Sequence, residues 1–178
     1  LDSLDETAKK ISAVNVICFQ NQLIVGKNSD WIGAKNSILA LCPHRISSAL
    51  ILGTGGAADA CLFALQFLGC QQIAMVSRNP EDHSSVPIMS WVNAASVLPA
   101  FELIINTTPL GMFPAIEQFP PLPYSRLLAS QKLFDLIYNP AETRFLQFGK
   151  EKGCATLNGL KMLEDQALAS WEFWKQSF

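Results

Sequence analysis

The stretch ILGTGGAADA, residues 51–60, places three glycines and three alanines directly after an apolar run. Residues 53–58 form the pattern G-x-G-x-x-A between a predicted strand and a predicted helix. In that position the pattern is typical of dinucleotide-binding proteins. Gly53 permits a tight turn, Gly55 lets the backbone approach a pyrophosphate, and Ala58 lets the helix pack closely on the strand. The anion would bind free N–H groups at the positive end of the helix. The alternative is a glycine-rich turn without a ligand.

The chain around this stretch alternates between apolar strand-like runs and helical patterns. Strands are predicted at 47–52, 71–77, 102–108, 132–138 and 154–157, and helices at 55–69, 141–153 and 158–176. Strands that alternate with helices predict an α/β protein with a doubly wound, mostly parallel sheet and helices on both faces. Residues 80–101 should hold a short helix and one strand, whose ends the pattern does not fix.

The first 42 residues follow a different pattern. Residues 1–10 indicate an amphipathic helix, and the apolar runs 13–19 and 22–26 indicate two paired strands. A helix is predicted over 29–42, with Ser29 or Asp30 placed to cap its start and Pro43 ending it.

The composition favours a core-rich folded protein, because 49% of the 178 residues are hydrophobic and 16% are charged. A net charge of −2 gives no basic face for nucleic acid, and no apolar run is long enough to span a membrane. The five scattered cysteines indicate reduced core thiols in a cytoplasmic protein, and no metal site is expected.

The end of the second predicted strand bears on which dinucleotide is bound. It carries Ser77, Arg78 and Asn79, with no acidic residue to hold the ribose hydroxyls of NAD. The guanidinium of Arg78 suits the 2′-phosphate of NADP, so NADP is the predicted cofactor. A solvated surface charge is the alternative for Arg78, and the nearby Glu81 and Asp82 would repel a phosphate.

Seven ordered segments together resemble the shikimate dehydrogenase family. They are ISAVNVI, VGKNSDWIG, LGTGGAADA, VSRNP, LIINTTPLGM, FDLIYNPAET and NGLKMLEDQA. The resemblance implies NADPH-dependent reduction of 3-dehydroshikimate to shikimate in chorismate and aromatic amino-acid biosynthesis. It divides the chain into the remnant of a smaller α/β substrate domain (1–42), an NADP-binding Rossmann domain (43–157) and a C-terminal helix packing back toward the substrate domain (158–178).

The resemblance also assigns the site. Asn15, Asp30, Tyr138 and Gln166 would contact the substrate ring, and Asp30 would be catalytic together with a lysine. The alternatives are a helix cap for Asp30, a buried tyrosine for Tyr138 and an ordinary solvated residue for Gln166. The dinucleotide contacts would be Gly53, Thr54, Gly55, Gly56, Ala57, Ser77, Arg78, Asn79, Leu136 and Gly159. Met162 could pack on the nicotinamide or fill the core, and Trp91, Trp171 and Trp174 are expected to be packing residues.

The sequence departs from the family in its first residues. The family's paired serines and the lysine that partners the aspartate lie upstream of the segment containing Asn15, and the fourteen residues before Asn15 hold no such motif. We therefore expect an incomplete chain, with a missing N-terminal segment or a fused 3-dehydroquinate dehydratase domain. Trp31 and Lys161 replace family glycines, which keeps quinate open as a related substrate.

Two other readings stay open at this point. A non-catalytic NADP- or shikimate-binding relative would bind its ligands without hydride transfer. A different Rossmann enzyme, such as a methylene-tetrahydrofolate dehydrogenase or a glutamyl-tRNA reductase, is disfavoured by the joint presence of Asn15, Asp30, Tyr138 and Gln166.

Overall fold

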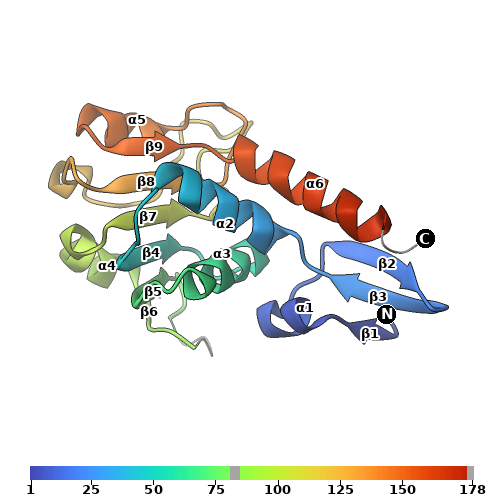
Figure 1. Cartoon of the computed structure of the whole chain (residues 1–178). Coiled ribbons are helices and arrows are strands. Elements are labelled where there is room, and N and C mark those ends of the chain that lie inside the picture. The colour runs from blue at the N-terminus through green and yellow to red at the C-terminus, as the bar shows by residue number, and fades with distance from the viewer. Residues whose placement is uncertain (81–84, 176–178) are drawn as a thin grey trace.

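The computed structural model describes residues 1–80 and 85–175 and contains two sheets (Figure 1). The N-terminal part comprises β1 Ser3–Leu4, α1 Glu6–Ile11, β2 Val16–Gln20, β3 Leu23–Lys27 and α2 Asp30–Leu41. The larger part comprises β4 Ser48–Leu52, α3 Gly56–Phe67, β5 Gln72–Val76, β6 Ile88–Met89, α4 Trp91–Val97, β7 Leu103–Asn106, β8 Lys132–Asp135, α5 Arg144–Glu151, β9 Ala155–Leu157 and α6 Leu160–Lys175. Single 3-10 turns follow α4 and precede β8.

The larger sheet is parallel, in the order β6-β5-β4-β7-β8-β9. The chain winds outward from β4 in one direction and then returns to wind outward from β7 in the other. This is the doubly wound order of dinucleotide-binding folds, and its switch point lies between β4 and β7, where ligands bind beyond the carboxyl ends of the strands. The predicted Rossmann-type α/β fold is confirmed.

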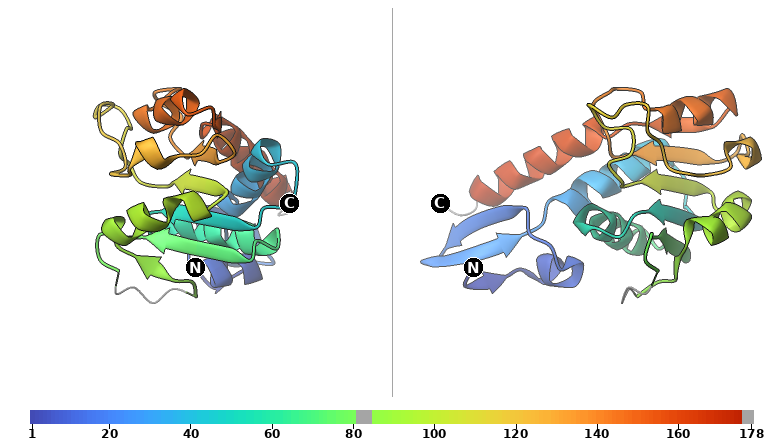
Figure 2. Two further views of the ribbon diagram at one scale, coloured as in Figure 1. Left: turned by 90° about the vertical axis from the view of Figure 1, so that its left-hand side faces the viewer. Right: turned by 180° about the vertical axis from the view of Figure 1, so that it is seen from behind.

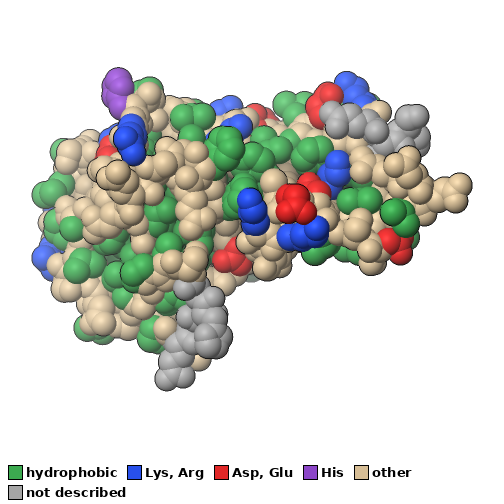
Figure 3. Space-filling model, turned by 60° about the horizontal axis from the view of Figure 1, so that its bottom comes forward, with side chains coloured by type: hydrophobic (Ala, Val, Ile, Leu, Met, Phe, Trp, Pro, Cys, Tyr) green, Lys and Arg blue, Asp and Glu red, His purple; other side chains and the backbone are tan. Residues whose placement is uncertain are grey.

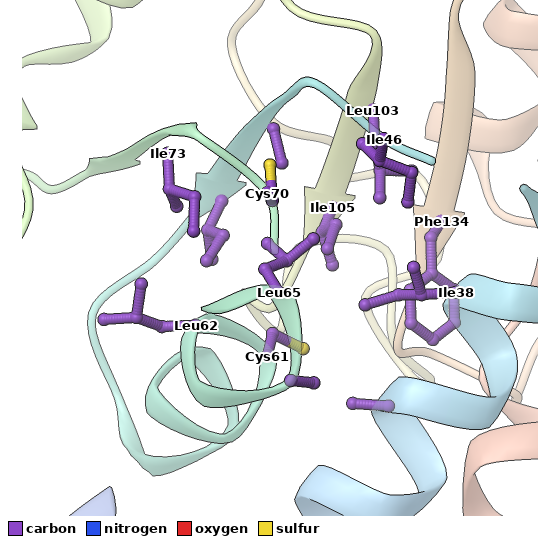
Figure 4. Packing of buried hydrophobic residues seen from close by; sticks show 14 of the residues in the cluster. Ile38, Ile46, Cys61, Leu62, Leu65, Cys70, Ile73, Leu103, Ile105 and Phe134 are labelled. Atoms are coloured by element: carbon purple, nitrogen blue, oxygen red, sulfur yellow. The ribbon is translucent and has the colours of Figure 1, made fainter. Parts of the chain in front are cut away.

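Strand β4 shows how the sheet forms two cores. All five of its residues are buried, and Ala49 and Ile51 pack with α2 and α3 whereas Leu50 and Leu52 pack with α4 and α5. This follows from the two-residue period of a strand, whose side chains alternate between the faces of the sheet. Figure 4 shows the first core, with Leu65 and Ile38 of the helices lying over the strand residues Ile105 and Phe134.

The small sheet has the order β1-β3-β2, with β2 and β3 antiparallel and β1 parallel to β3. It extends beyond the end of the larger sheet, and α6 runs from the larger part toward it (Figures 1 and 2). Trp174 near the end of α6 donates its indole N–H to the carbonyl of Ile17 on β2, at 3.0 Å. Gly33 allows α2 to cross α6 closely, because a Cβ there would lie 2.4 Å from the carbonyl oxygen of Met162.

One local prediction needs correction, and another is narrowed. Residues 1–10 do not form one helix, because β1 comes first and α1 begins only after Asp5, whose carboxylate accepts from the N–H of Ala8 at 2.7 Å. Trp171 and Trp174 were expected as core or helix-packing residues, and their exposed fractions of 55% and 43% exclude the core and leave helix packing. The helix and strand expected within 80–101 are present as α4 and β6.

All five cysteines are buried as free thiols. Among the described residues, no helix is long and apolar enough to cross a bilayer.

Candidate functional site

The glycine-rich loop joins β4 to α3. Gly53 has φ +122°, and a Cβ there would lie 2.5 Å from Oγ1 of Thr107, so only glycine fits this turn. A Cβ on Gly55 would meet nothing within 4 Å, which leaves the backbone open to a ligand. Ala58 is fully buried against the strand. Each small residue thus has the environment that the sequence pattern predicts for it.

The start of α3 presents free backbone donors. The N-cap residue is Gly55, which has no side chain to accept from the first N–H groups of the helix. The first N–H groups of α3 that donate within the protein are those of Ala58 and Asp59, which both donate to the carbonyl of Gly55. Among the described residues, the N–H groups of residues 54–57 donate to no protein acceptor. Unpaired N–H groups at a helix N-terminus are the kind of donor that can bind an anion such as a pyrophosphate.

One cleft of about 560 Å³ extends from this loop to the end of β5. Gly53, Thr54 and Gly55 line it together with Ser77, Arg78 and Trp91. Arg78 is exposed, and among the described residues no acidic side chain forms an ion pair with its guanidinium. The hydroxyl of Ser77 accepts from the N–H of Asn79 at 3.1 Å and shapes the turn that carries Arg78.

Trp91 was expected to be a packing residue only. It does pack against the second core, and it also lines this cleft beside Arg78, so it is available to a flat ring there. Trp91 is the first residue of α4, which follows directly after β6, and β6 is placed by its pairing with β5. The sequence pattern did not fix the ends of either element. Glu81 and Asp82, which would oppose a phosphate, lie outside the described residues.

A second cleft, of about 410 Å³, lies on the other side of the switch point. Ala57, Thr107, Thr108, Leu136 and Tyr138 are among its lining residues. Tyr138 is 51% exposed, so it is not the buried tyrosine of the alternative interpretation.

Gly159 packs closely on Leu136, which lines this second cleft, and Met162 belongs to the core against which Leu136 packs. A Cβ on Gly159 would lie 1.9 Å from the carbonyl oxygen of Leu136, so this glycine is required for close packing of the two segments. Met162 is buried in the first core, which places it as core filler rather than as an exposed platform.

Three of the four residues predicted to contact substrate meet in one polar cluster. The amide of Asn15 donates to Oδ1 of Asp30 at 2.7 Å and to Oγ of Ser29 at 3.0 Å. The hydroxyl of Ser29 donates in turn to Oε1 of Gln166 at 3.3 Å. Tyr138 has no hydrogen bond to this cluster among the described residues and faces the second cleft instead.

Ser29 joins the cluster although it was predicted only as a possible helix cap. It is the N-cap residue of α2 by position, but its side chain makes no cap hydrogen bond. Its hydroxyl is 2.9 Å from Oγ of Ser170 on α6, and its N–H donates to Oδ1 of Asn15 at 2.8 Å. A local sequence pattern cannot reveal this role, because Ser29 and Ser170 are 141 positions apart.

Asp30 is the first residue of α2 rather than its cap. Burial raises the pKa of its carboxyl above the ordinary value, and the hydrogen bond from Asn15 lowers this pKa in part. A carboxyl group with a raised pKa in a polar cluster is suited to exchange a proton.

The lysines of α1 do not reach Asp30. Lys9 and Lys10 are exposed, and Lys9 pairs with Glu6 at 2.8 Å. Figure 3 shows acidic and basic side chains together on the surface where the smaller part joins the larger one. Among residues 1–80 and 85–175, no lysine or arginine forms an ion pair with Asp30.

Trp31 and Lys161, which stand where the family has glycines, both contact neighbouring side chains. Trp31 stacks edge-on against Phe63 of α3 at 5.2 Å between ring centroids and also contacts Phe67. Lys161 pairs with Asp165 at 2.9 Å. Trp31 therefore packs α2 against α3, and the ammonium group of Lys161 pairs with Asp165, one helical turn further along α6.

Within the described part of the chain, no group of three or more metal-ligating side chains occurs.

The strand order and the glycine-rich loop after β4 define the class of Rossmann-type dinucleotide-binding folds. Comparison with known proteins narrows this class. No family model matches the chain. The NADP(+) shikimate dehydrogenase of Methanosphaera stadtmanae is 33% identical over 185 residues, covering 97% of this chain and 65% of that protein. The enzyme of the same name from Crocosphaera subtropica is 33% identical over 192 residues, covering 99% of this chain and 67% of that protein.

A solved structure agrees with these relatives. The chorismate mutase/shikimate 5-dehydrogenase fusion protein of Clostridium acetobutylicum has a TM-score of 0.90 and 35% identity, with 99% of this chain and 65% of that chain covered. The chain belongs to the shikimate dehydrogenase family, and the resemblance seen in the sequence is confirmed. The chain spans about two-thirds of the length of the relatives it matches.

Proposed function

We propose that the protein is the NADP-binding and substrate-orienting part of a shikimate dehydrogenase, which reduces 3-dehydroshikimate to shikimate in chorismate and aromatic amino-acid biosynthesis. One observation carries the proposal: the polar cluster and the phosphate loop adjoin. A Cβ on Gly56 would lie 3.5 Å from Cβ of Ala13, two residues before Asn15. A dinucleotide bound at the glycine-rich loop and a substrate ring bound at the polar cluster would therefore lie next to each other.

Bound NADPH would supply the hydride. On this proposal the N–H groups of residues 54–57 hold the pyrophosphate, and Arg78 holds the 2′-phosphate. Leu136 and Gly159 form the side of the cofactor site that holds the nicotinamide. Tyr138 reaches toward the substrate ring. Residues 1–42 are then the remnant of the substrate domain, 43–157 are the cofactor domain, and 158–178 are the helix that packs back toward the substrate domain. The protein works in the cytoplasm.

The residues of the cluster have separable roles in this proposal. The amide of Asn15 fixes the carboxylate of Asp30 at 2.7 Å, and Asp30 exchanges the proton of the reacting ring hydroxyl. The Oε1 of Gln166 accepts from the hydroxyl of Ser29, and its Nε2 donates one proton to the carbonyl of Leu163 and has a second proton for a ring hydroxyl. The lysine that the family resemblance pairs with the aspartate would come from the third of the relatives that this chain does not match.

A second candidate function is cofactor or substrate binding without turnover. The observation that favours it is Asp30, which has no lysine or arginine partner among the described residues. Quinate in place of shikimate, and fusion to a 3-dehydroquinate dehydratase, stay predictions.

Two measurements test the proposal. Calorimetric titration should show that NADPH binds more tightly than NADH, and equal affinity would overturn the NADP assignment. Shikimate-dependent reduction of NADP+, followed by near-UV absorbance, should be absent or weak for this chain. It should appear when the missing third of a relative is joined to it. Absence of turnover in the joined protein, with NADPH still bound, would favour the binding-only function.

A further inference from the structure

A buried polar pair lies beneath the second cleft, at the ends of two neighbouring strands. Asn106 ends β7 and Asp135 ends β8, and the two residues are partners in the sheet register. Both are fully buried, and Nδ2 of Asn106 donates to Oδ1 of Asp135 at 3.0 Å. A buried carboxylate is costly unless it is well hydrogen-bonded, so its placement here calls for a structural reason.

The carboxylate of Asp135 collects donors from two further segments. Its Oδ1 also accepts from the N–H of Ile137 at 3.1 Å, and its Oδ2 accepts from the hydroxyl of Thr143 at 2.5 Å. Thr143 is 1% exposed and caps the start of α5. Asp135 therefore ties the segment leading to Tyr138 both to α5 and to β7.

The amide oxygen of Asn106 extends the network to the turn after β7. It accepts from the N–H of Thr108 at 3.1 Å and from the hydroxyl of Thr108 at 2.7 Å. Thr107 and Thr108 line both clefts, whereas Leu136 and Tyr138 line the second one. The two turns that flank the second cleft are thus joined through a single buried carboxylate.

We propose that Asp135 is a positioning residue that sets the separation of the two turns forming the nicotinamide side of the cofactor cleft. The proposal rests on the proposed function, because it takes the dinucleotide as the ligand. Asp135 is fully buried and lines neither cleft, so it acts through Thr108 and Ile137 rather than by contact with the ligand.

The conservative substitution Asp135→Asn should preserve this arrangement. The asparagine oxygen can accept from Asn106 and Ile137, and its amide can donate to the hydroxyl of Thr143, which rotates to accept. Asp135→Ala removes the acceptors and leaves Asn106, Ile137 and Thr143 without their partner.

The test compares two ligands that bind different extents of the cofactor site. NADPH spans both sides of the cleft, whereas adenosine 2′,5′-bisphosphate reaches only the loop and Arg78. We expect Asp135→Ala to weaken NADPH binding by about tenfold, without changing the affinity for the bisphosphate, and Asp135→Asn to restore NADPH binding. Both affinities are read by calorimetric titration at one pH.

A matched control is available at the opposite end of the sheet. Gln131 is 2% exposed, and its amide donates to the carbonyls of Leu98 and Phe101 before β8 begins. Gln131→Leu should lower stability yet leave both affinities unchanged. If Asp135→Ala weakens both ligands equally, or weakens neither, the positioning role is wrong.

Should Asp135→Ala fail to fold, Thr143 provides a milder test. Thr143→Val removes one donor to Asp135, and Thr143→Ser keeps it; Thr143 lines neither cleft. A loss of about threefold in NADPH affinity is expected for the valine variant only, and equal affinities for the two variants would overturn the proposal. If the unaltered protein bound neither ligand, the proposed function would fail first.

Discussion

Asp135 is expected to make the stability of the protein depend on pH with a sign opposite to that of most carboxylates. Burial raises the pKa of its carboxyl from 3.8 to about 6, against the lowering effect of the hydrogen bonds from Thr143, Ile137 and Asn106. A pKa raised by folding stabilises the native state at low pH. This contribution is fully present below pH 3.8 and is lost as the pH rises through about 6.

The magnitude follows from the size of the shift. A difference of about two units corresponds to about 3 kcal/mol over the full range, because each unit is about 1.4 kcal/mol. Between about pH 4.5 and pH 7.5 the change is about 2 kcal/mol, because the unfolded carboxyl is already partly ionised at the lower pH. The Asp135→Asn variant keeps the hydrogen bonds and does not titrate, so it should lack this contribution.

Urea unfolding of both proteins across this pH range measures the effect. The free energy of unfolding of the unaltered protein should fall relative to that of the asparagine variant as the pH rises. Other titrating groups are common to both proteins and cancel in the difference. The Gln131→Leu variant, which removes no titrating group, serves as the control and should run parallel to the unaltered protein. Parallel curves for Asp135→Asn as well would refute the raised pKa and the burial argument behind it.

Four substitutions test the remaining geometry. Gly55→Ala should leave stability unchanged but weaken NADPH binding, since a Cβ there meets no protein atom within 4 Å; titration and urea unfolding together decide this. Gly53→Ala should destabilise the fold itself, because its φ is +122° and Thr107 lies in the way; unchanged unfolding would contradict the turn geometry. Arg78→Ala should weaken NADPH binding by about tenfold or more and leave NADH binding unaffected, and equal losses would show that the guanidinium does not read the 2′-phosphate. Gly33→Ala should cost about 1–3 kcal/mol in urea unfolding by forcing α2 away from α6, and no loss would mean that the crossing can relax.

Much of the fold could be predicted from local pattern. The run 48–52 is buried on both faces of the sheet, and such a strand appears in sequence as a continuous apolar segment. The glycine spacing at 53–58 specifies a turn that only glycine can make at Gly53, which is why the phosphate loop could be located without coordinates. Strand β1 was predicted as helix and the ends of β6 were not fixed, because two-residue strands are defined by their partners rather than by their own sequence.

The candidate site, like the fold, contains some residues that the sequence predicted and others that only the structure reveals. Family resemblance pointed to Asn15, Asp30 and Gln166, and the tertiary structure places them in one hydrogen-bonded cluster through Ser29. No local pattern predicts the positions of Ser29, Trp91 or the buried Asp135, because their hydrogen bonds and cleft position depend on residues supplied by other elements.

The sequence alone determined the alternation of strands and helices from residue 47 onward and the place of the glycine turn, because these depend on periodicity and on backbone constraints within a few residues. Its seven ordered motifs indicated the family by resemblance. Only the tertiary structure decided which carboxylate is buried at the strand ends, which turn faces which cleft, and where α6 meets the small sheet. Those features depend on contacts between residues far apart in the chain, and the free energy of such contacts is fixed by packing rather than by local preference.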